Sequence, residues 1–116
     1  MSISRNFVRS ALAASAFVAL AAPAVAHHGF GLFQMDIMKK WSGTLTKMNL
    51  VNPHSYMELD VIAEKGKKVH MRCEMRAAAL LRRSGWSIEM FKPGSHVEIE
   101  GRPHRDDPAA CYIENF

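Results

Sequence analysis

Three stretches of the chain alternate apolar and polar residues with a period of two. They are SYMELDVIA (55–63), VHMRCEM (69–75) and HVEIEG (96–101). This alternation is typical of β-strands that bury one face and expose the other to solvent. The EKGKK segment (64–68) between the first two is polar and contains a glycine, which predicts a hairpin turn.

Two further segments alternate less regularly and are also predicted to be strands: KWSGTLTKM (40–48) and CYIENF (111–116). Gly43 inside the first of them predicts a bend or a bulge. Lys92, Pro93 and Gly94 are typical of a tight turn, with proline and then glycine at its centre.

One helix is predicted over MRAAALLRRSGW (75–86), which places Ala77, Leu80 and Leu81 on one face and ends at Gly85. The order is then three strands, one helix and two strands. A mainly β, OB-like five-stranded barrel with one helix between strands 3 and 4 has this order. A two-layer arrangement of a sheet and a helix is the alternative.

The first 26 residues have the features of a secretory signal peptide. Arg5 and Arg9 are followed by an apolar run (10–22) and by Ala24-Val25-Ala26, the small-x-small pattern that signal peptidase accepts. The run is shorter than the roughly 20 residues that a membrane span requires. The residue directly after the cleavage site is not a cysteine, so a lipid anchor is not indicated. We therefore expect a single domain (27–116) that is periplasmic or secreted, with no membrane anchor.

Charge adds little once the leader is set aside. The chain has 15 Lys and Arg against 11 Asp and Glu, and the leader accounts for two of the arginines. The remaining chain is close to neutral, so nothing indicates a nucleic-acid partner, and export argues against one.

Cys73 and Cys111 share the parity of their apolar neighbours on the third and fifth predicted strands, which lie close together in an OB-like barrel. An oxidising compartment favours a disulfide over two free thiols. Such a bond stabilises a small domain by roughly 2–4 kcal/mol. The spacing excludes a CxxC redox or zinc motif.

Several short motifs occur in order across most of residues 27–116. They are HHGF (27–30), FQMD (33–36), a strand with a glycine, NPH (52–54), Glu74, LLRRSGW (80–86) and KPG (92–94). In this set the chain resembles a family of small exported bacterial proteins, the domain of unknown function 6152 (DUF6152). The family usually opens with His-His-Ser-Phe, where this chain has Gly29, and it often has tryptophan where this chain has Leu50 and Met71. The resemblance implies kinship and export, and no settled activity.

Cleavage after Ala26 would leave His27 at the amino terminus, where its α-amine and ring Nδ1 can chelate one metal ion. Amine and imidazole donors suit Cu(II), with a further imidazole from His28, His54 or His104. The simpler interpretation is that the His-His terminus is a tail, stapled to the barrel by Phe30 and Phe33.

The loops on either side of the expected ligand face hold the other candidate residues. Asn52 and His54 lie in the loop between strands 1 and 2, and His104 lies in RPHRDDP (102–108), between strands 4 and 5. In OB-like barrels these two loops border the ligand face. Each motif is equally compatible with an ordinary turn or polar loop.

The remaining polar and aromatic residues are interpreted structurally. No nucleophile motif is present. Glu74 is predicted to pair with Arg82 or Arg83; the alternative is that it accepts hydrogen bonds from the backbone at the start of the helix. His70 and His96 are predicted to be solvated, and Trp41 and Trp86 to be core or rim aromatics.

The sequence thus favours a non-catalytic binding module for an unknown ligand or protein, with no reaction assigned. A copper-binding or copper-handling protein is the alternative. An enzyme that uses an N-terminal copper brace is a third class.

Overall fold

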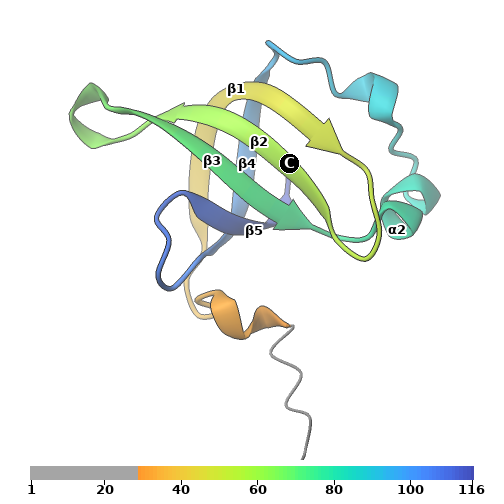
Figure 1. Ribbon diagram of the computed structural model, residues 1–116, viewed down its shortest axis with the longest axis horizontal. Helices are drawn as coiled ribbons and strands as arrows, with labels where there is room; N and C mark the ends of the chain where they lie inside the picture. Colours follow the sequence, from red (N-terminus) through yellow and green to blue (C-terminus); the bar gives the residue numbers. More distant parts are fainter. Residues whose placement is uncertain (1–28) are drawn as a thin grey trace, which may run out of the picture.

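Five strands close into a barrel in the order β1-β2-β3-β5-β4 (Figure 1). The computed structural model describes residues 29–116, so the predicted leader and the candidates His27 and His28 lie outside the described residues. The strands are β1 (Lys39–Asn49), β2 (Ser55–Ile62), β3 (Lys68–Met75), β4 (His96–Pro103) and β5 (Ala110–Asn115). Only β3 and β5 pair in parallel; the other neighbouring strands are antiparallel. The OB-like barrel is confirmed for the described residues, and the two-layer alternative is not formed.

Three of the connections between strands are short, and the one between β3 and β4 (76–95) is long. The short helix η1 (Phe30–Leu32) precedes β1, η2 (Glu64–Gly66) lies between β2 and β3, and α2 (Ala78–Arg83) and η3 (Ile88–Met90) lie between β3 and β4. The predicted hairpin and tight turn are both present. Gly66 and Gly94 have positive φ there, of 74° and 91°, which glycine adopts without steric cost. None of the described helices is long and apolar enough to cross a membrane.

The helix between β3 and β4 is shorter than predicted. It begins at Ala78, because Met75 still pairs with Ser55 in the sheet and Ala77 remains extended at ψ 146°. The buried positions are consequently Ala78 and Leu81, while Leu80 is 45 % exposed. The predicted inward face was therefore wrong at Leu80.

The strand alternation does sort side chains between the barrel interior and its outer face. Met57, Leu59 and Met71 are almost fully buried, as are Ile99 and Ile113. Trp41 and Trp86 are partly buried and pack against this core, as predicted. Burial of these side chains is the main driving force for closing the barrel.

The irregularity in β1 lies later than predicted. The pairing of β1 with β2 shifts between Leu45 and Lys47, so the bulge is not at Gly43. Gly43 instead allows a close approach of strands, because a Cβ there would overlap the backbone carbonyl of Asp60. The prediction of an irregularity was right for the strand and wrong for the residue.

The seam between β3 and β5 is closed by the predicted disulfide. Cys73 and Cys111 are directly paired across the two strands, fully buried and covalently linked. The bond joins residues 38 apart in the chain, at the place where the barrel has its only parallel pairing.

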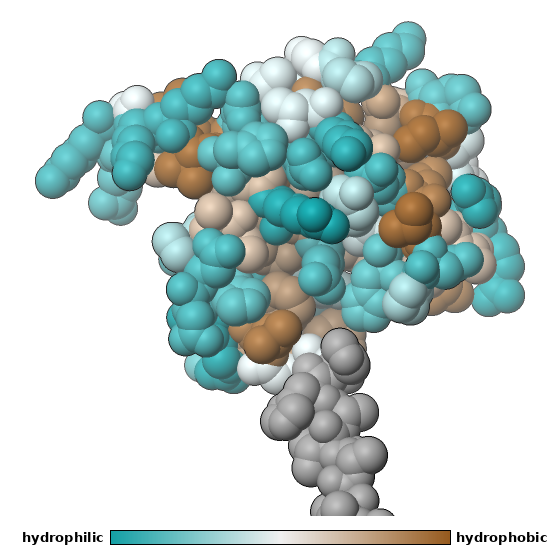
Figure 2. All heavy atoms as spheres, in the orientation of Figure 1, coloured by the Kyte–Doolittle hydropathy of each residue, from teal (hydrophilic) through white to brown (hydrophobic). Residues whose placement is uncertain are grey.

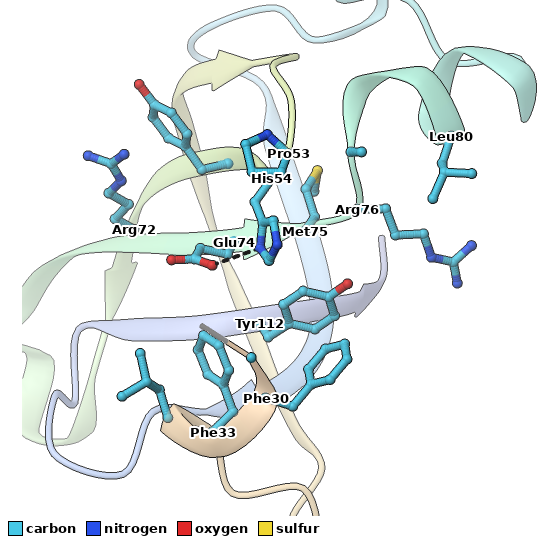
Figure 3. Close-up of a pocket in the computed structure, with 14 residues that line it drawn as sticks. Phe30, Phe33, Pro53, His54, Arg72, Glu74, Met75, Arg76, Leu80 and Tyr112 are labelled. Carbon is cyan, nitrogen blue, oxygen red and sulfur yellow. Dashed lines mark hydrogen bonds and ion pairs between the residues drawn. The ribbon is translucent and has the colours of Figure 1, made fainter. Parts of the chain in front are cut away.

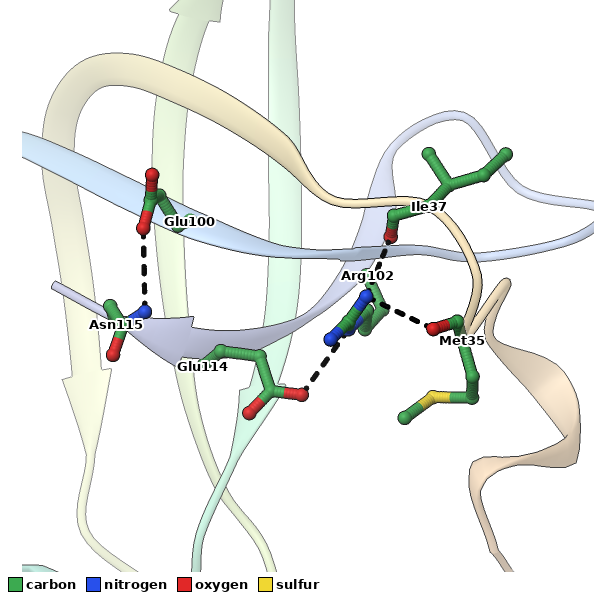
Figure 4. A network of polar contacts seen from close by, with 6 residues as sticks. All are labelled: Met35, Ile37, Glu100, Arg102, Glu114 and Asn115. Atoms are coloured by element: carbon green, nitrogen blue, oxygen red, sulfur yellow. Dashed lines mark hydrogen bonds and ion pairs between the residues drawn. The ribbon is translucent and has the colours of Figure 1, made fainter.

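The segment before β1 is tied to β4. Arg102 donates to the backbone carbonyls of Met35 (3.0 Å) and Ile37 (3.4 Å) and pairs with Glu114 at 3.3 Å (Figure 4). Farther back, Gln34 donates its backbone N–H to Pro103 at 2.9 Å. These bonds hold the segment from Phe30 onward against the barrel.

A candidate ligand-binding groove

A groove of about 570 Å³ lies along the outer face of β3. We call it the β3 groove. One wall comes from η1 and the residue after it, with Phe30 and Phe33, and the other comes from α2, with Leu80. Tyr56 of β2 and Tyr112 of β5 also line the groove. Its polar groups are His54, Arg72, Glu74 and Arg76 (Figure 3).

The register of three strands sets the centre of the groove. Glu74 of β3 is paired with Tyr56 of β2 on one side and with Tyr112 of β5 on the other. Residues paired in this way project from the same face of a sheet. One carboxylate therefore lies between two phenol rings, directly above the disulfide seam.

His54 contacts that carboxylate. Its Nδ1 lies 3.2 Å from Oε2 of Glu74, and both side chains are about half exposed. A carboxylate can only accept, so the ring donates through Nδ1–H and, in the neutral imidazole, Nε2 keeps its lone pair. The prediction that Glu74 pairs with Arg82 or Arg83 was wrong, because neither arginine lines this face of the sheet.

The loop that carries His54 is anchored to α2. Val51 accepts the backbone N–H of Ala78 at 2.9 Å, and the Asn52 side chain accepts that of Ala79 at 3.3 Å. These are amides of the first helical turn that have no partner inside the helix. The structure thus gives Asn52, predicted as a ligand contact, a capping role that places His54 over Glu74.

The start of the described chain forms the opposite wall. The ring of Phe30 meets Tyr112 edge-on, with centroids 5.0 Å apart, and Gly29 also lines the groove. Phe33 is 5 % exposed and packs against both Tyr112 and His104. The segment is therefore stapled to the barrel through its phenylalanines, as one interpretation of the sequence expected.

His104 lies behind this segment and outside the groove. Its Nδ1 accepts the backbone N–H groups of Asp106 and Asp107, each at 3.1 Å. The same loop binds the segment, because Arg105 donates its backbone N–H to Leu32 at 2.9 Å. Of the two loops expected to border the ligand face, only the one with His54 does so; residues 31–34 cover the other.

Two arginines stand on either side of Glu74 along β3. Arg72 lies over the face of the Tyr56 ring, 3.8 Å from its centroid, an arrangement typical of cation–π contact. Arg76 follows at the end of the strand, and both side chains are exposed. Within residues 29–116, neither guanidinium has a carboxylate within ion-pair distance.

The phenol hydroxyl of Tyr112 stays protonated at neutral pH. Burial, with a smaller effect of Glu114, raises the pKa of its phenol above the ordinary value of 10.0, while Arg76 acts in the opposite direction. At neutral pH the wall beneath the arginines therefore adds no negative charge to the groove.

The other histidines lie elsewhere. His70 and His96 are on exposed strand faces, as predicted. In the part of the chain that the structure describes, no three His, Cys, Asp or Glu side chains are grouped so as to hold a metal ion.

Arg72, Arg76, Tyr56 and Tyr112 were not among the candidate residues predicted from the sequence. Arg72, Glu74 and Arg76 are two residues apart, which places them on the same face of an extended strand. That spacing could be read from the sequence. The residues of β5 and η1 that contact this face could not be predicted, because their position depends on how the barrel closes.

Comparisons with known proteins add a family and nothing more. The model of a family described as "Family of unknown function (DUF6152)" matches residues 14–112. No curated protein and no solved structure matches the chain.

Proposed function

Because the chain belongs to DUF6152, a family of unknown function, its role must be inferred from its own geometry, and we propose that it is an exported, non-catalytic binding module whose ligand occupies the β3 groove. The leader-like residues 1–26 support export. The groove supports binding.

One observation carries the binding role. The β3 groove combines apolar walls, of which Phe30 and Leu80 are 50 % and 45 % exposed, with a few polar groups at its floor. Small-molecule sites typically have this composition and a volume of 300–1,000 Å³.

Export is tested by expressing the complete gene in a bacterial host and measuring the intact mass of the periplasmic protein. We expect a chain that begins at His27. A full-length product that stays in the cytoplasm would contradict this part of the proposal.

Binding is tested by NMR, with organic acids, amines and alcohols that share one ring system. We expect amide shifts to change around the groove, and Leu80→Trp to weaken binding at least fivefold by filling it. Ile62→Trp is the matched control, because Ile62 is an exposed aliphatic residue at the other end of β2. Shifts confined to other surfaces, or equal losses in the two variants, would refute a groove ligand.

A second candidate, copper binding, is favoured by the position of Gly29. Gly29 lines the same groove as His54 and follows His27-His28 directly. Cleavage after Ala26 would thus produce the chelating amine and imidazole two residues from the groove.

The bond between His54 and Glu74 also suits a metal ligand. Metal-binding histidines commonly donate their other ring N–H to a carboxylate, which orients the ring and leaves one nitrogen free. His54 does so through Nδ1. His104 is not included, because metal binding at its Nε2 would shift the proton to Nδ1 and break two backbone hydrogen bonds.

Copper binding is tested by calorimetry and electron paramagnetic resonance on the processed protein. One extra residue before His27 should weaken Cu(II) binding at least tenfold, and Glu74→Gln should weaken it by about tenfold or more. His70→Gln is the control, because that ring pairs with carboxylates outside the groove. Equal Cu(II) affinity in all forms would remove this candidate.

A further inference from the structure

We infer that the β3 groove takes a small organic anion with a flat apolar body, whose charged group is held by one of the two arginines that flank Glu74, Arg72 or Arg76. This inference rests on the proposed binding function and names its ligand class. It follows from the charges, the stacking and the exposed apolar surface of the groove.

The charges of the groove are unequal. Two guanidinium groups and one carboxylate line it, and the carboxylate of Glu74 already accepts a hydrogen bond from His54. The two guanidinium groups against one carboxylate leave the lining with about one net positive charge. The groove therefore favours an anion over a cation of the same shape.

Arg72 is held in an orientation that suits an anion. The Tyr56 ring covers one face of the guanidinium, so the N–H groups around its edge remain free to donate. Within residues 29–116 the Arg72 and Arg76 side chains make no ion pair that would use these donors. Arginine binds carboxylates through such a planar fork of two N–H groups.

The apolar part of the ligand is indicated by the two walls. Leu80 of α2 and Phe30 of η1 lie on either side of Arg76 and Tyr112 (Figure 3). Both remain about half exposed. A flat ring placed between them would cover this apolar surface while its charged group reaches an arginine.

The size of the groove favours a small molecule over an extended polymer. A volume of about 570 Å³ lies within the range of pockets that hold small ligands. The segment from Phe30 to Gln34, bonded to the loop after β4, closes one side of it.

The experiment uses the processed protein from the complete gene and three naphthalene probes: 2-naphthoate, 2-naphthalenemethanol and 2-naphthylmethylammonium. Dissociation constants come from NMR titrations that also locate each probe. We expect naphthoate to bind at least tenfold tighter than the alcohol, and the ammonium compound to bind most weakly.

The arginines are tested one at a time. Arg72→Gln or Arg76→Gln, whichever removes the arginine that holds the carboxylate, should weaken naphthoate binding by about fivefold to tenfold, the effect of losing one charge-assisted hydrogen bond in a partly exposed site. Unchanged naphthoate affinity in both variants would overturn the inference. Binding of the alcohol should not change. Arg82→Gln and Arg83→Gln are matched controls, because these arginines are exposed on α2 and do not line the groove.

The outcomes separate the inference from the proposed function. If all three probes bind in the groove with similar affinity, the anion inference is wrong and the binding function remains. If none binds there, the binding function is wrong. If the control variants lose as much naphthoate affinity as the groove variants, the attraction is general surface charge and the inference is overturned.

Discussion

Two histidine–carboxylate pairs lie along β2 and β3 and the loop before β2, in different surroundings. His54 and Glu74 lie in the β3 groove, with Nδ1 and Oε2 3.2 Å apart. His70 and Asp60 lie nearer the β2–β3 hairpin, with Nδ1 and Oδ1 2.7 Å apart. The two pairs contain the same chemical groups, and their neighbours give them different properties.

In the pair near the hairpin, both side chains make further ion pairs with neighbouring charged residues. The second nitrogen of His70 faces Glu58 at 3.5 Å, and Lys68 binds Asp60 at 3.0 Å. His70, Asp60, Glu58 and Lys68 thus all have a partner within this cluster. In the groove, by contrast, the second nitrogen of His54 has no such carboxylate within the described chain, which leaves it available to a ligand.

The surfaces around the two pairs also differ. Figure 2 shows hydrophilic side chains at the end of the projecting hairpin, a hydrophobic patch at its base, and further hydrophobic side chains on the side of α2. Beneath the groove, β3 is paired with β5 from Arg72 to Glu74, whereas His70 lies beyond that pairing. The supporting strand and the neighbouring apolar walls therefore distinguish a candidate site from a solvated ion pair.

Removal of the disulfide should have the largest effect and should act at the groove end. We expect Cys73→Ala combined with Cys111→Ala to lower the free energy of unfolding by about 2–4 kcal/mol. Denaturant unfolding measures the loss. Amide exchange should accelerate more at Arg72 and Tyr112 than at Asp60, because only the former lie on the β3–β5 seam. Uniform acceleration would contradict this difference between the two ends.

Two glycines allow the ends to be disturbed separately. A Cβ at Gly101 would overlap the carbonyl of Tyr112, and one at Gly43 would overlap the carbonyl of Asp60. We expect each alanine variant to lose about 1–3 kcal/mol of stability through forced backbone shifts. Only Gly101→Ala should also weaken binding of a groove probe. Equal loss of binding in Gly43→Ala would show that the two ends are coupled.

The smallest effect is on the pH dependence of the pair near the hairpin. The hydrogen bond to Asp60, with a lesser one to Glu58, raises the pKa of His70 above its ordinary 6.5. The hydrogen bonds from His70 and Lys68 lower the pKa of Asp60 below 3.8. The stabilisation from His70 is complete below pH 6.5 and is lost as the pH rises through the raised pKa; that from Asp60 is present above pH 3.8 and is lost as the pH falls.

Titration of His70 by NMR measures this effect. Asp60→Asn should lower its pKa more than Glu58→Gln does, because the Asp60 contact is the shorter and stronger one. The change in stability should be small, since exposed ion pairs are screened by solvent. A pKa of His70 that is unaffected by Asp60→Asn would show that the pair does not form in solution.

Much of the fold follows from local patterns in the sequence. Alternation placed Met57, Leu59 and Val61 on one face, and all three are buried. The shared parity of Cys73 and Cys111 predicted their disulfide. These predictions succeed because a strand that buries one face must repeat every two residues, whatever lies opposite it.

The site depended on contacts between distant segments. Alternation alone places Glu74 on the outer face, but its partner is His54, brought there by a loop that caps α2. His104 was an equally plausible candidate ligand in the sequence, but its ring accepts backbone hydrogen bonds from its own loop instead. Residue type and spacing thus determined the strands, the inward faces and the cysteine pair. Register, barrel closure and the docking of η1 decided which polar groups meet, because those contacts join residues whose separation along the chain carries no periodic signal.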